Sequence, residues 1–175
     1  PGQRNSGAGM NRVAQMTGTV AGVGYLRPAP GTWGSLAALP LAAVLQMIGG
    51  FPLMLAACAV TFLAGWWATR EMTKGQENHD PSEIVMDEVA GQLIALLPLS
   101  FGAWHADVAM TAMWPGWIAA FVLFRLFDIT KPGPIGWADR RNDALGVMLD
   151  DVIAGVFAAL GVAVLAWLAH WVLGV

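Results

Sequence analysis

The sequence predicts an all-α integral membrane protein, a bundle of about five hydrophobic helices of which some are short or re-entrant. Three observations predict this class. Of the 175 residues, 57% are hydrophobic and only 12% are charged, whereas a soluble domain carries about 25% charged residues. No charged residue occurs between Pro28 and Thr69. The C-terminal run 152–175 is also free of Asp, Glu, Lys and Arg, and it exceeds the roughly 20 apolar residues that a membrane span needs.

Glycine and proline divide the apolar sequence into separate helices. Gly49, Gly50 and Pro52 interrupt the first run, so we expect a tight turn there. Pro98 lies inside the third apolar segment. The second and fifth helices are long enough to span a bilayer, whereas the first and third are short enough to be tilted or re-entrant. The expected helices cover residues 33–48, 52–70, 89–104, 108–124 and 152–175.

The length favours a single domain. We expect a flexible polar segment over residues 1–23 and one membrane-embedded domain over 24–175. The first residues lack the pattern of a signal peptide, so internal segments are expected to insert into the membrane. A net charge of −3 argues against a nucleic-acid partner. The single cysteine, Cys58, excludes an internal disulfide, and no Cys/His spacing suggests a zinc site.

The basic residues occur in three segments that alternate with the expected helices. These segments contain Arg4, Arg12 and Arg27; Arg70 and Lys74; and Arg125, Lys131, Arg140 and Arg141. Neither of the intervening turns, 49–51 and 98–107, contains a Lys or Arg. A general avoidance of apolar runs by basic residues would not leave every second turn empty. Five spans place the three segments on one side, which the positive-inside rule makes the cytoplasm, with the C-terminus outside.

The acidic residues gather on the same side as the basic ones. Of the twelve Asp and Glu residues, only Asp107 lies in an outer turn. Asp87 and Glu88 stand at the start of the third helix, and Asp150 and Asp151 at the start of the fifth. Paired carboxylates at the end of an apolar helix are costly unless a cation neutralises them. Mg²⁺ is the natural candidate, because it takes oxygen ligands.

Structural roles explain some of the other charged residues. The helix dipole favours Asp80 and Glu83 before the third helix, although it serves acids one turn deeper less well. Arg140 and Arg141 are expected to anchor lipid headgroups. Neither role explains paired acids at the starts of two different helices. A metal site does.

Two cations accompany these acids. Arg125 and Asp128 are three residues apart at the inner end of the fourth helix, so they can form an internal salt bridge or face the same site. Lys131 follows in a stiff turn with prolines at 132 and 134. Arg and Lys side chains are the usual partners of phosphate oxygens. The cations therefore predict an anionic ligand beside the metal.

A glycine motif, PAPGTWGS, precedes the first helix at residues 28–35. Glycines let backbone N–H groups approach a ligand, and the N-terminus of a helix is suited to bind an anion. An ordinary capped helix start is the commoner use of such residues. Gly31 and Thr32 are therefore candidates for phosphate binding rather than a site by themselves.

Carboxylates, cations and a position at the headgroup level together favour phosphoryl chemistry on a lipid. Two alternatives stay open. A divalent-cation or proton transporter also uses intramembrane carboxylates, but the outer halves of the helices offer only His105 and Asp107. A phosphoalcohol transferase would need an extended aspartate signature along one helix, which Asp150 and Asp151 do not supply.

Three segments resemble the bacterial phosphatidylglycerophosphatase A family: PAPGTWGSLAALP, DPSEIVMDEVAGQ and FRLFDITKPGPIGWADRR…GVMLDDVIAGV. They occur in the family's order and cover most of residues 24–157. The resemblance implies a multi-pass, Mg²⁺-dependent enzyme of the bacterial inner (cytoplasmic) membrane with its active site facing the cytoplasm. It implies hydrolysis of phosphatidylglycerophosphate to phosphatidylglycerol and phosphate, with membrane lipid as surroundings and the oligomeric state open.

The motifs and the resemblance together define the expected site. The metal ligands are expected to be Asp80, Asp87, Glu88, Asp150 and Asp151. The expected catalytic residues are Asp87, Glu88, Asp128, Asp150 and Asp151, and the expected phosphate-binding residues are Lys131, Arg125, Gly31 and Thr32. Direct attack by metal-activated water is the preferred mechanism, with the general base unassigned. Where relatives are expected to carry Gly-Gly before the paired aspartates, this chain has Asp143-Ala144.

Overall fold

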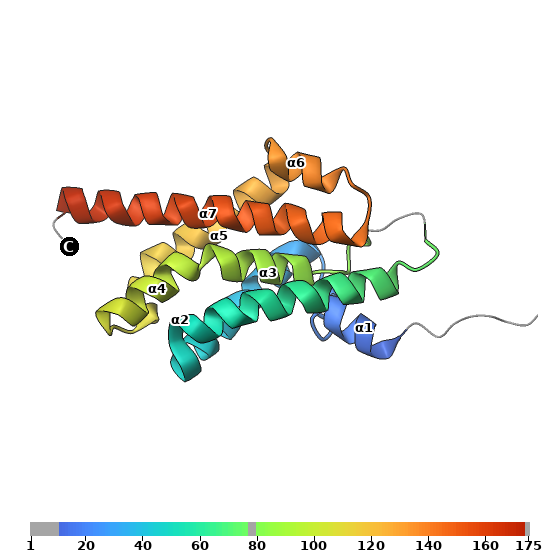
Figure 1. The fold of residues 1–175 in the computed structure, drawn as a ribbon, viewed down its shortest axis with the longest axis horizontal. Coiled ribbons are helices and arrows are strands. Elements are labelled where there is room, and N and C mark those ends of the chain that lie inside the picture. The colour runs from blue at the N-terminus through green and yellow to red at the C-terminus, as the bar shows by residue number, and fades with distance from the viewer. Residues whose placement is uncertain (1–10, 77–79, 174–175) are drawn as a thin grey trace, which may run out of the picture.

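The computed structural model describes residues 11–76 and 80–173, and in these residues it contains helices and no strand (Figure 1). The predicted all-α class is confirmed. In chain order the elements are α1 (Arg12–Gly18), the 3-10 helix η1 (Val23–Tyr25), α2 (Pro30–Met72), α3 (Met86–Ala95), α4 (Leu97–Ala106), the 3-10 helix η2 (Met110–Met113), α5 (Trp114–Thr130), α6 (Pro134–Asp139) and α7 (Ala144–Leu173).

Helix α2 contains the turn that was predicted between the first two hydrophobic helices. Gly50 has φ 59° and ψ −152°, which is not helical and which side chains other than glycine rarely allow. Figure 1 shows the chain doubling back at this point. A Cβ on Gly50 would lie 2.8 Å from a ring carbon of Trp104, so the turn also packs closely against α4. The two arms of α2 correspond to the two expected helices.

The third expected helix is broken into α3 and α4. The two are bent by 43° at the break before Pro98, which lies in the first turn of α4. Proline lacks the N–H group that would continue the hydrogen-bond ladder of α3, so the helix bends there. By length and composition, Pro30–Met72, Met110–Thr130 and Ala144–Val172 can cross a membrane, and the bent pair adds a fourth candidate. These apolar helices identify a membrane protein.

Several boundaries differ from those expected, most of all in α5 and α7. Helix α5 continues to Thr130 rather than ending at 124, and α7 begins at Ala144 rather than near 152. The paired aspartates of α7 therefore lie inside the helix and not at its start. In α7, the side chain of Asp143 accepts a hydrogen bond of 2.6 Å from the N–H of Gly146, which caps the earlier start. Residues 12–18 form α1, in contrast to the flexible segment expected over 1–23, whose first ten residues lie outside the described chain.

Helices α3 and α7 cross with almost no space between their backbones. A Cβ on Gly155 would lie 2.4 Å from the carbonyl oxygen of Gly91, and a Cβ on Gly91 would lie 2.6 Å from the carbonyl oxygen of Asp151. Phe124 of α5 is fully buried against the same crossing. Small residues permit such close helix contacts in membrane proteins. The crossing places the start of α3 beside the acidic part of α7.

Candidate active site

Acidic residues from several elements meet at the end of the bundle where α3 and α7 begin and α5 ends. A cavity of about 90 Å³ is lined there by six aspartates, a glutamate and three other residues: Asp80, Asp87, Glu88, Asp128, Asp139, Asp150, Asp151, Lys131, Asn142 and Val147. The turn of α2 at Gly50, the end of α4 and the C-terminal end of α7 lie at the opposite end of the molecule (Figure 1). The structure thus brings all five predicted catalytic acids into one cavity.

Three carboxylates form the most compact part of this cavity. Asp87, Glu88 and Asp151 each offer an oxygen, and these oxygens lie within 4.8 Å of one another. Oδ1 of Asp87, Oε2 of Glu88 and Oδ1 of Asp151 are buried and accept no hydrogen bond in the described part of the chain. Buried carboxylates without a partner are strongly unfavourable. An oxygen-seeking divalent cation would satisfy all three, so the donor set fits Mg²⁺.

The N-terminal region fixes the position of Asp87 and Glu88. They occupy the first turn of α3, whose preceding residue Val85 donates its N–H to the carbonyl of Gly18 at 2.9 Å. A Cβ on Gly34 would lie 2.8 Å from Cβ of Val85, so the start of α2 packs directly against the same residue. Helix α3 begins at Met86, three residues before the expected start at 89.

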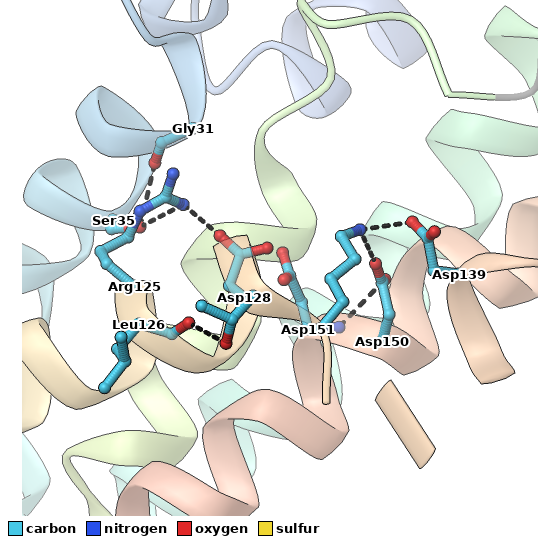
Figure 2. A network of polar contacts seen from close by, with 10 residues as sticks. Gly31, Ser35, Arg125, Leu126, Asp128, Asp139, Asp150 and Asp151 are labelled. Carbon is cyan, nitrogen blue, oxygen red and sulfur yellow. Dashed lines mark hydrogen bonds and ion pairs between the residues drawn. The ribbon is translucent and has the colours of Figure 1, made fainter. Parts of the chain in front are cut away.

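Lys131 joins the end of α5 to α6 and α7. Its ammonium donates to Asp150 Oδ2 at 2.5 Å and to Asp139, as Figure 2 shows for the two carboxylates. Burial disfavours the charged form of this lysine, but the hydrogen bonds to Asp139 and Asp150 outweigh it and raise its pKa above the usual value. The backbone of Lys131 has φ 45° and ψ 51°, which ends α5 and turns the chain into α6.

Asp80 precedes α3 and lines the same cavity. Its pKa is raised from the usual value because burial disfavours the carboxylate, while the charge of Lys131 opposes the shift. Asp80 is not one of the three carboxylates within 4.8 Å of each other. The structure therefore places it at the edge of the predicted metal site rather than in its centre.

Arg125 connects α5 to the first turns of α2. Its guanidinium lies 2.5 Å from Asp128 Oδ2 and donates to the hydroxyl of Ser35 at 3.4 Å, and that hydroxyl in turn donates to the carbonyl of Gly31 at 2.9 Å (Figure 2). Arg125 does not line the acidic cavity. Its contacts are those of a residue that holds Asp128 and the start of α2 in place.

Gly31 touches the acidic site, whereas the side chain of Thr32 does not. A Cβ on Gly31 would lie 2.1 Å from Oε1 of Glu88 and 3.1 Å from a guanidinium nitrogen of Arg125, so only glycine fits. The N–H of Thr32 bonds to the carbonyl of Ala29 at 3.0 Å. Thr32 is absent from the residues that line the cavity. Gly31 in this motif therefore allows the start of α2 to lie close to the carboxylates.

Residues 16–166 match the family model described as Phosphatidylglycerophosphatase A. The chain belongs to the phosphatidylglycerophosphatase A family. It is 38% identical over 141 residues to phosphatidylglycerophosphatase A of Haemophilus influenzae, which covers 79% of this chain and 80% of that protein. It is 35% identical over 153 residues to phosphatidylglycerophosphatase A of Escherichia coli, covering 83% and 78%. Family membership places the chain among the phosphatases.

A third relative carries a different name. The chain is 37% identical over 164 residues to a Bacteroides thetaiotaomicron protein provisionally named a phosphatidylinositol-3-phosphatase, covering 91% of this chain and 94% of that protein. No solved structure matches the chain significantly. The relatives therefore share a lipid phosphate ester as the named substrate class, and their names differ in the headgroup.

Sequence reasoning missed three residues around the site of this phosphatidylglycerophosphatase A family member. Asp139 holds Lys131, Asn142 lines the cavity, and Ser35 links Arg125 to Gly31. The signal for Asp139 was present, because the prolines after Lys131 predict a turn that returns the chain toward it. Arg141, expected as a lipid anchor, bonds to Asp143 at 3.0 Å and lies 5.9 Å from the ring centre of Trp137.

Proposed function

We propose that this protein hydrolyses the terminal phosphate monoester of phosphatidylglycerophosphate to give phosphatidylglycerol and phosphate. One observation carries the proposal: Asp87, Glu88 and Asp151 line one small cavity with Lys131, and each offers an oxygen within 4.8 Å of the others. Each also has a buried oxygen without a hydrogen-bond partner among the described residues. The names of the Haemophilus influenzae and Escherichia coli relatives support the choice of substrate. The proposed cofactor is Mg²⁺, held by Asp87, Glu88 and Asp151, with Asp80 and Asp150 beside it.

Each side chain has a role that follows from its place. Bound Mg²⁺ supplies a Lewis acid for the phosphoryl oxygen and lowers the pKa of an attacking water. Lys131 binds the scissile phosphate by exchanging a carboxylate partner for a phosphate oxygen. Asp128 and Asp150 line the cavity next to the trio and orient the attacking water. The proton that water loses passes to one of these carboxylates. As the bond between phosphorus and the glycerol oxygen breaks, that oxygen takes up a proton from one of the cavity acids, and phosphatidylglycerol leaves as the alcohol.

The start of α2 completes the phosphate site. In its first turn the N–H groups of Thr32 and Trp33 donate to the carbonyl of Ala29, whereas no described residue accepts a hydrogen bond from the N–H of Gly31, and the N-cap residue makes no side-chain bond. An anion is favoured at such a helix N-terminus. Arg125, which was expected to bind phosphate directly, is assigned to hold Asp128. Thr32, also expected to bind phosphate, is assigned no contact with it, because its N–H donates to the carbonyl of Ala29.

We further propose that the acidic end of the bundle faces the cytoplasm in the bacterial inner membrane. The described arginines and lysines lie in the segments that flank this end, and the opposite turn around Gly50 carries none. The positive-inside rule assigns such an end to the cytoplasm. A transporter would need ionisable groups through the whole bundle. At the opposite end the described residues offer only His105, Asp107 and, in the last turn of α7, His170.

The test is phosphate release by purified protein in detergent, first with Mg²⁺ and then with excess EDTA. Phosphatidylglycerophosphate, phosphatidylinositol 3-phosphate and phosphatidic acid are compared at equal mole fraction, since the relatives are named for two headgroups. We expect Mg²⁺-dependent release that is fastest from phosphatidylglycerophosphate. Preference for the inositol lipid would reassign the substrate, and release that survives EDTA would remove the metal from the proposal.

A further inference from the structure

A second and larger cavity lies between the end of α2 and the start of α7. Its volume is about 520 Å³, and it shares no lining residue with the acidic cavity. Trp66, Arg70 and Lys74 form the α2 wall, and Asp143 and Leu145 belong to the α7 wall. This cavity is called the α2–α7 groove below. The proposed hydrolysis makes no use of it.

The α2 wall offers two cations. Trp66 and Arg70 are four residues apart on one face of α2, and Lys74 lies in the turn just after the helix ends and lines the same cavity. Arg70 is exposed and forms no ion pair in the described part of the chain. Lys74 pairs with Glu71 at 2.8 Å, but 68% of its side chain stays exposed. The groove therefore presents positive charge that the protein itself leaves partly uncompensated.

Along α2, the residues on this side change from apolar to charged at Arg70. No charged residue occurs between Pro28 and Thr69, so Arg70 marks the point where α2 leaves its apolar run. Trp66 is 36% exposed one turn before it. Tryptophan is enriched at the membrane–water interface, and basic residues just beyond that level attract anionic lipid headgroups. In a membrane, Trp66 would lie on the side of the acyl chains, and Arg70 and Lys74 on the side of the phosphate groups.

The acid on the opposite wall does not cancel this charge. Asp143 bonds to Arg141 at 3.0 Å and accepts from the N–H of Gly146 at 2.6 Å. The hydrogen bond from Arg141 lowers the pKa of Asp143 despite its slight burial, so the carboxylate is already paired. Arg70 and Lys74 are left to meet a ligand.

We propose that the α2–α7 groove binds the phosphodiester headgroup of an acidic membrane phospholipid at a site separate from the active site. The phosphate lies at Arg70 and Lys74, and the acyl chains pass Trp66 and Leu145. The site is independent of the reaction, because none of its residues belongs to the acidic cavity. A failure of this proposal would therefore leave the proposed hydrolysis unaffected, and a failure of the proposed hydrolysis would leave this proposal unaffected.

The test measures quenching of tryptophan fluorescence by phospholipids with brominated acyl chains, added to the full-length protein in mixed micelles. Phosphatidylserine, whose headgroup carries a net negative charge, is compared with phosphatidylcholine, whose phosphodiester is balanced by the choline cation. Subtracting the signal of Trp66→Phe isolates the quenching of Trp66. We expect this component to saturate at lower mole fraction with phosphatidylserine. In Arg70→Gln/Lys74→Gln the half-saturating fraction rises by roughly tenfold or more, because each basic residue near an anionic membrane surface strengthens the attraction about fivefold.

The matched control is Arg12→Gln/Arg140→Gln, which removes two exposed cations of the flanking segments outside the groove. It keeps the preference for phosphatidylserine. Hydrolysis by Arg70→Gln/Lys74→Gln is retained, which shows that the variant is folded. The proposal is overturned if wild type binds both lipids equally, if the groove variant keeps the preference, if the control loses it equally, or if soluble glycerophosphate displaces the lipid.

Discussion

At the scale of single residues, the site depends on which partner each of two neighbouring aspartates contacts. Asp150 and Asp151 are neighbours in α7, yet Asp150 bonds to Lys131 while Asp151 joins Asp87 and Glu88. Successive residues on a helix point about 100° apart, so two adjacent acids serve different partners. We assign Asp151 to the metal and Asp150 to the lysine and the attacking water.

Replacing Asp151 with asparagine keeps the shape of the side chain and removes its negative charge, so it tests whether the charge is needed at this position. We expect Mg²⁺-dependent phosphate release to fall by about two orders of magnitude, because a ligand charge is lost from the metal site. In EDTA, the variant is expected to melt at the same temperature as wild type or higher, since one of three clustered negative charges is gone. A variant with normal turnover would remove Asp151 from the metal site.

Gly31 provides a second test at the residue scale. In Gly31→Ala the new methyl group would lie 2.1 Å from Oε1 of Glu88, so Glu88 must move. We expect kcat/KM to fall on the order of 100-fold, as for displacements of about 1 Å in other active sites. Gly102→Ala is the matched control, because its Cβ meets nothing closer than 3.7 Å, and it keeps activity within about twofold. Equal activity of the two variants would contradict the close approach.

At the scale of elements, the crossing of α3 and α7 decides the geometry of the metal site. The carbonyls of Gly91 and Asp151 lie at the closest point of the two backbones, one turn from Glu88. Helix α6 then returns the chain from Lys131 to Asp139, so the lysine is held from two sides. The site is therefore a product of helix packing rather than of one local motif.

Widening this crossing should weaken both stability and metal binding. In Gly155→Ala the methyl group would lie 2.4 Å from the backbone oxygen of Gly91, which cannot rotate away. We expect the free energy of unfolding in detergent to fall by about 1–3 kcal/mol, with weaker stabilisation by Mg²⁺. Gly161→Ala, whose methyl group would meet the flexible end of Leu123 at 2.9 Å, is the milder control. Equal effects of both variants would argue against a special role for the crossing.

The cap of α7 gives a prediction with a pH dependence. Asp143→Ala removes the acceptor for the N–H of Gly146, and we expect a loss of about 1 kcal/mol in the free energy of unfolding, while Asp143→Ser retains most of it. Because the pKa of Asp143 is lowered in the folded protein, the contribution is complete above the unfolded value of about 3.9. It disappears as the pH falls through the lower folded pKa.

Denaturant unfolding of wild type and Asp143→Ala between pH 3 and pH 7 measures this difference. A constant gap between the two proteins across the whole range would show that the carboxylate charge does not contribute.

The limits of sequence reasoning lie at this scale as well. Asp87, Glu88, Asp150 and Asp151 could be predicted as site residues, because paired acids in apolar helices need a cation. Which of these acids would bind the metal and which would bind Lys131 could not be predicted, because that depends on how α3 and α7 are rotated where they cross at Gly91 and Gly155. The start of α7 was missed because Asp143 caps a helix two turns before the hydrophobic run that marked it.

At the scale of the whole molecule, the charges and the apolar helices are separated along the bundle. The described part of the chain holds the acidic cavity and the α2–α7 groove at one end, while the opposite end is formed by the turn at Gly50 and the end of α4 (Figure 1). Helices that are long and apolar enough to cross a membrane connect the two ends. In the orientation that we propose, a lipid phosphate would reach the carboxylates without leaving the membrane surface.

The central claim is that Asp87, Glu88 and Asp151 hold a divalent metal ion. The most direct measurement is Mn²⁺ binding to the purified protein, followed by the paramagnetic resonance signal of free Mn²⁺, because carboxylate sites for Mg²⁺ also accept Mn²⁺. We predict that wild type binds Mn²⁺ in competition with Mg²⁺ and that Asp151→Asn binds it at least about tenfold more weakly, consistent with the loss of one charged ligand. Wild-type protein that binds no Mn²⁺, or an Asp151→Asn variant that binds it as tightly as wild type, would contradict the account.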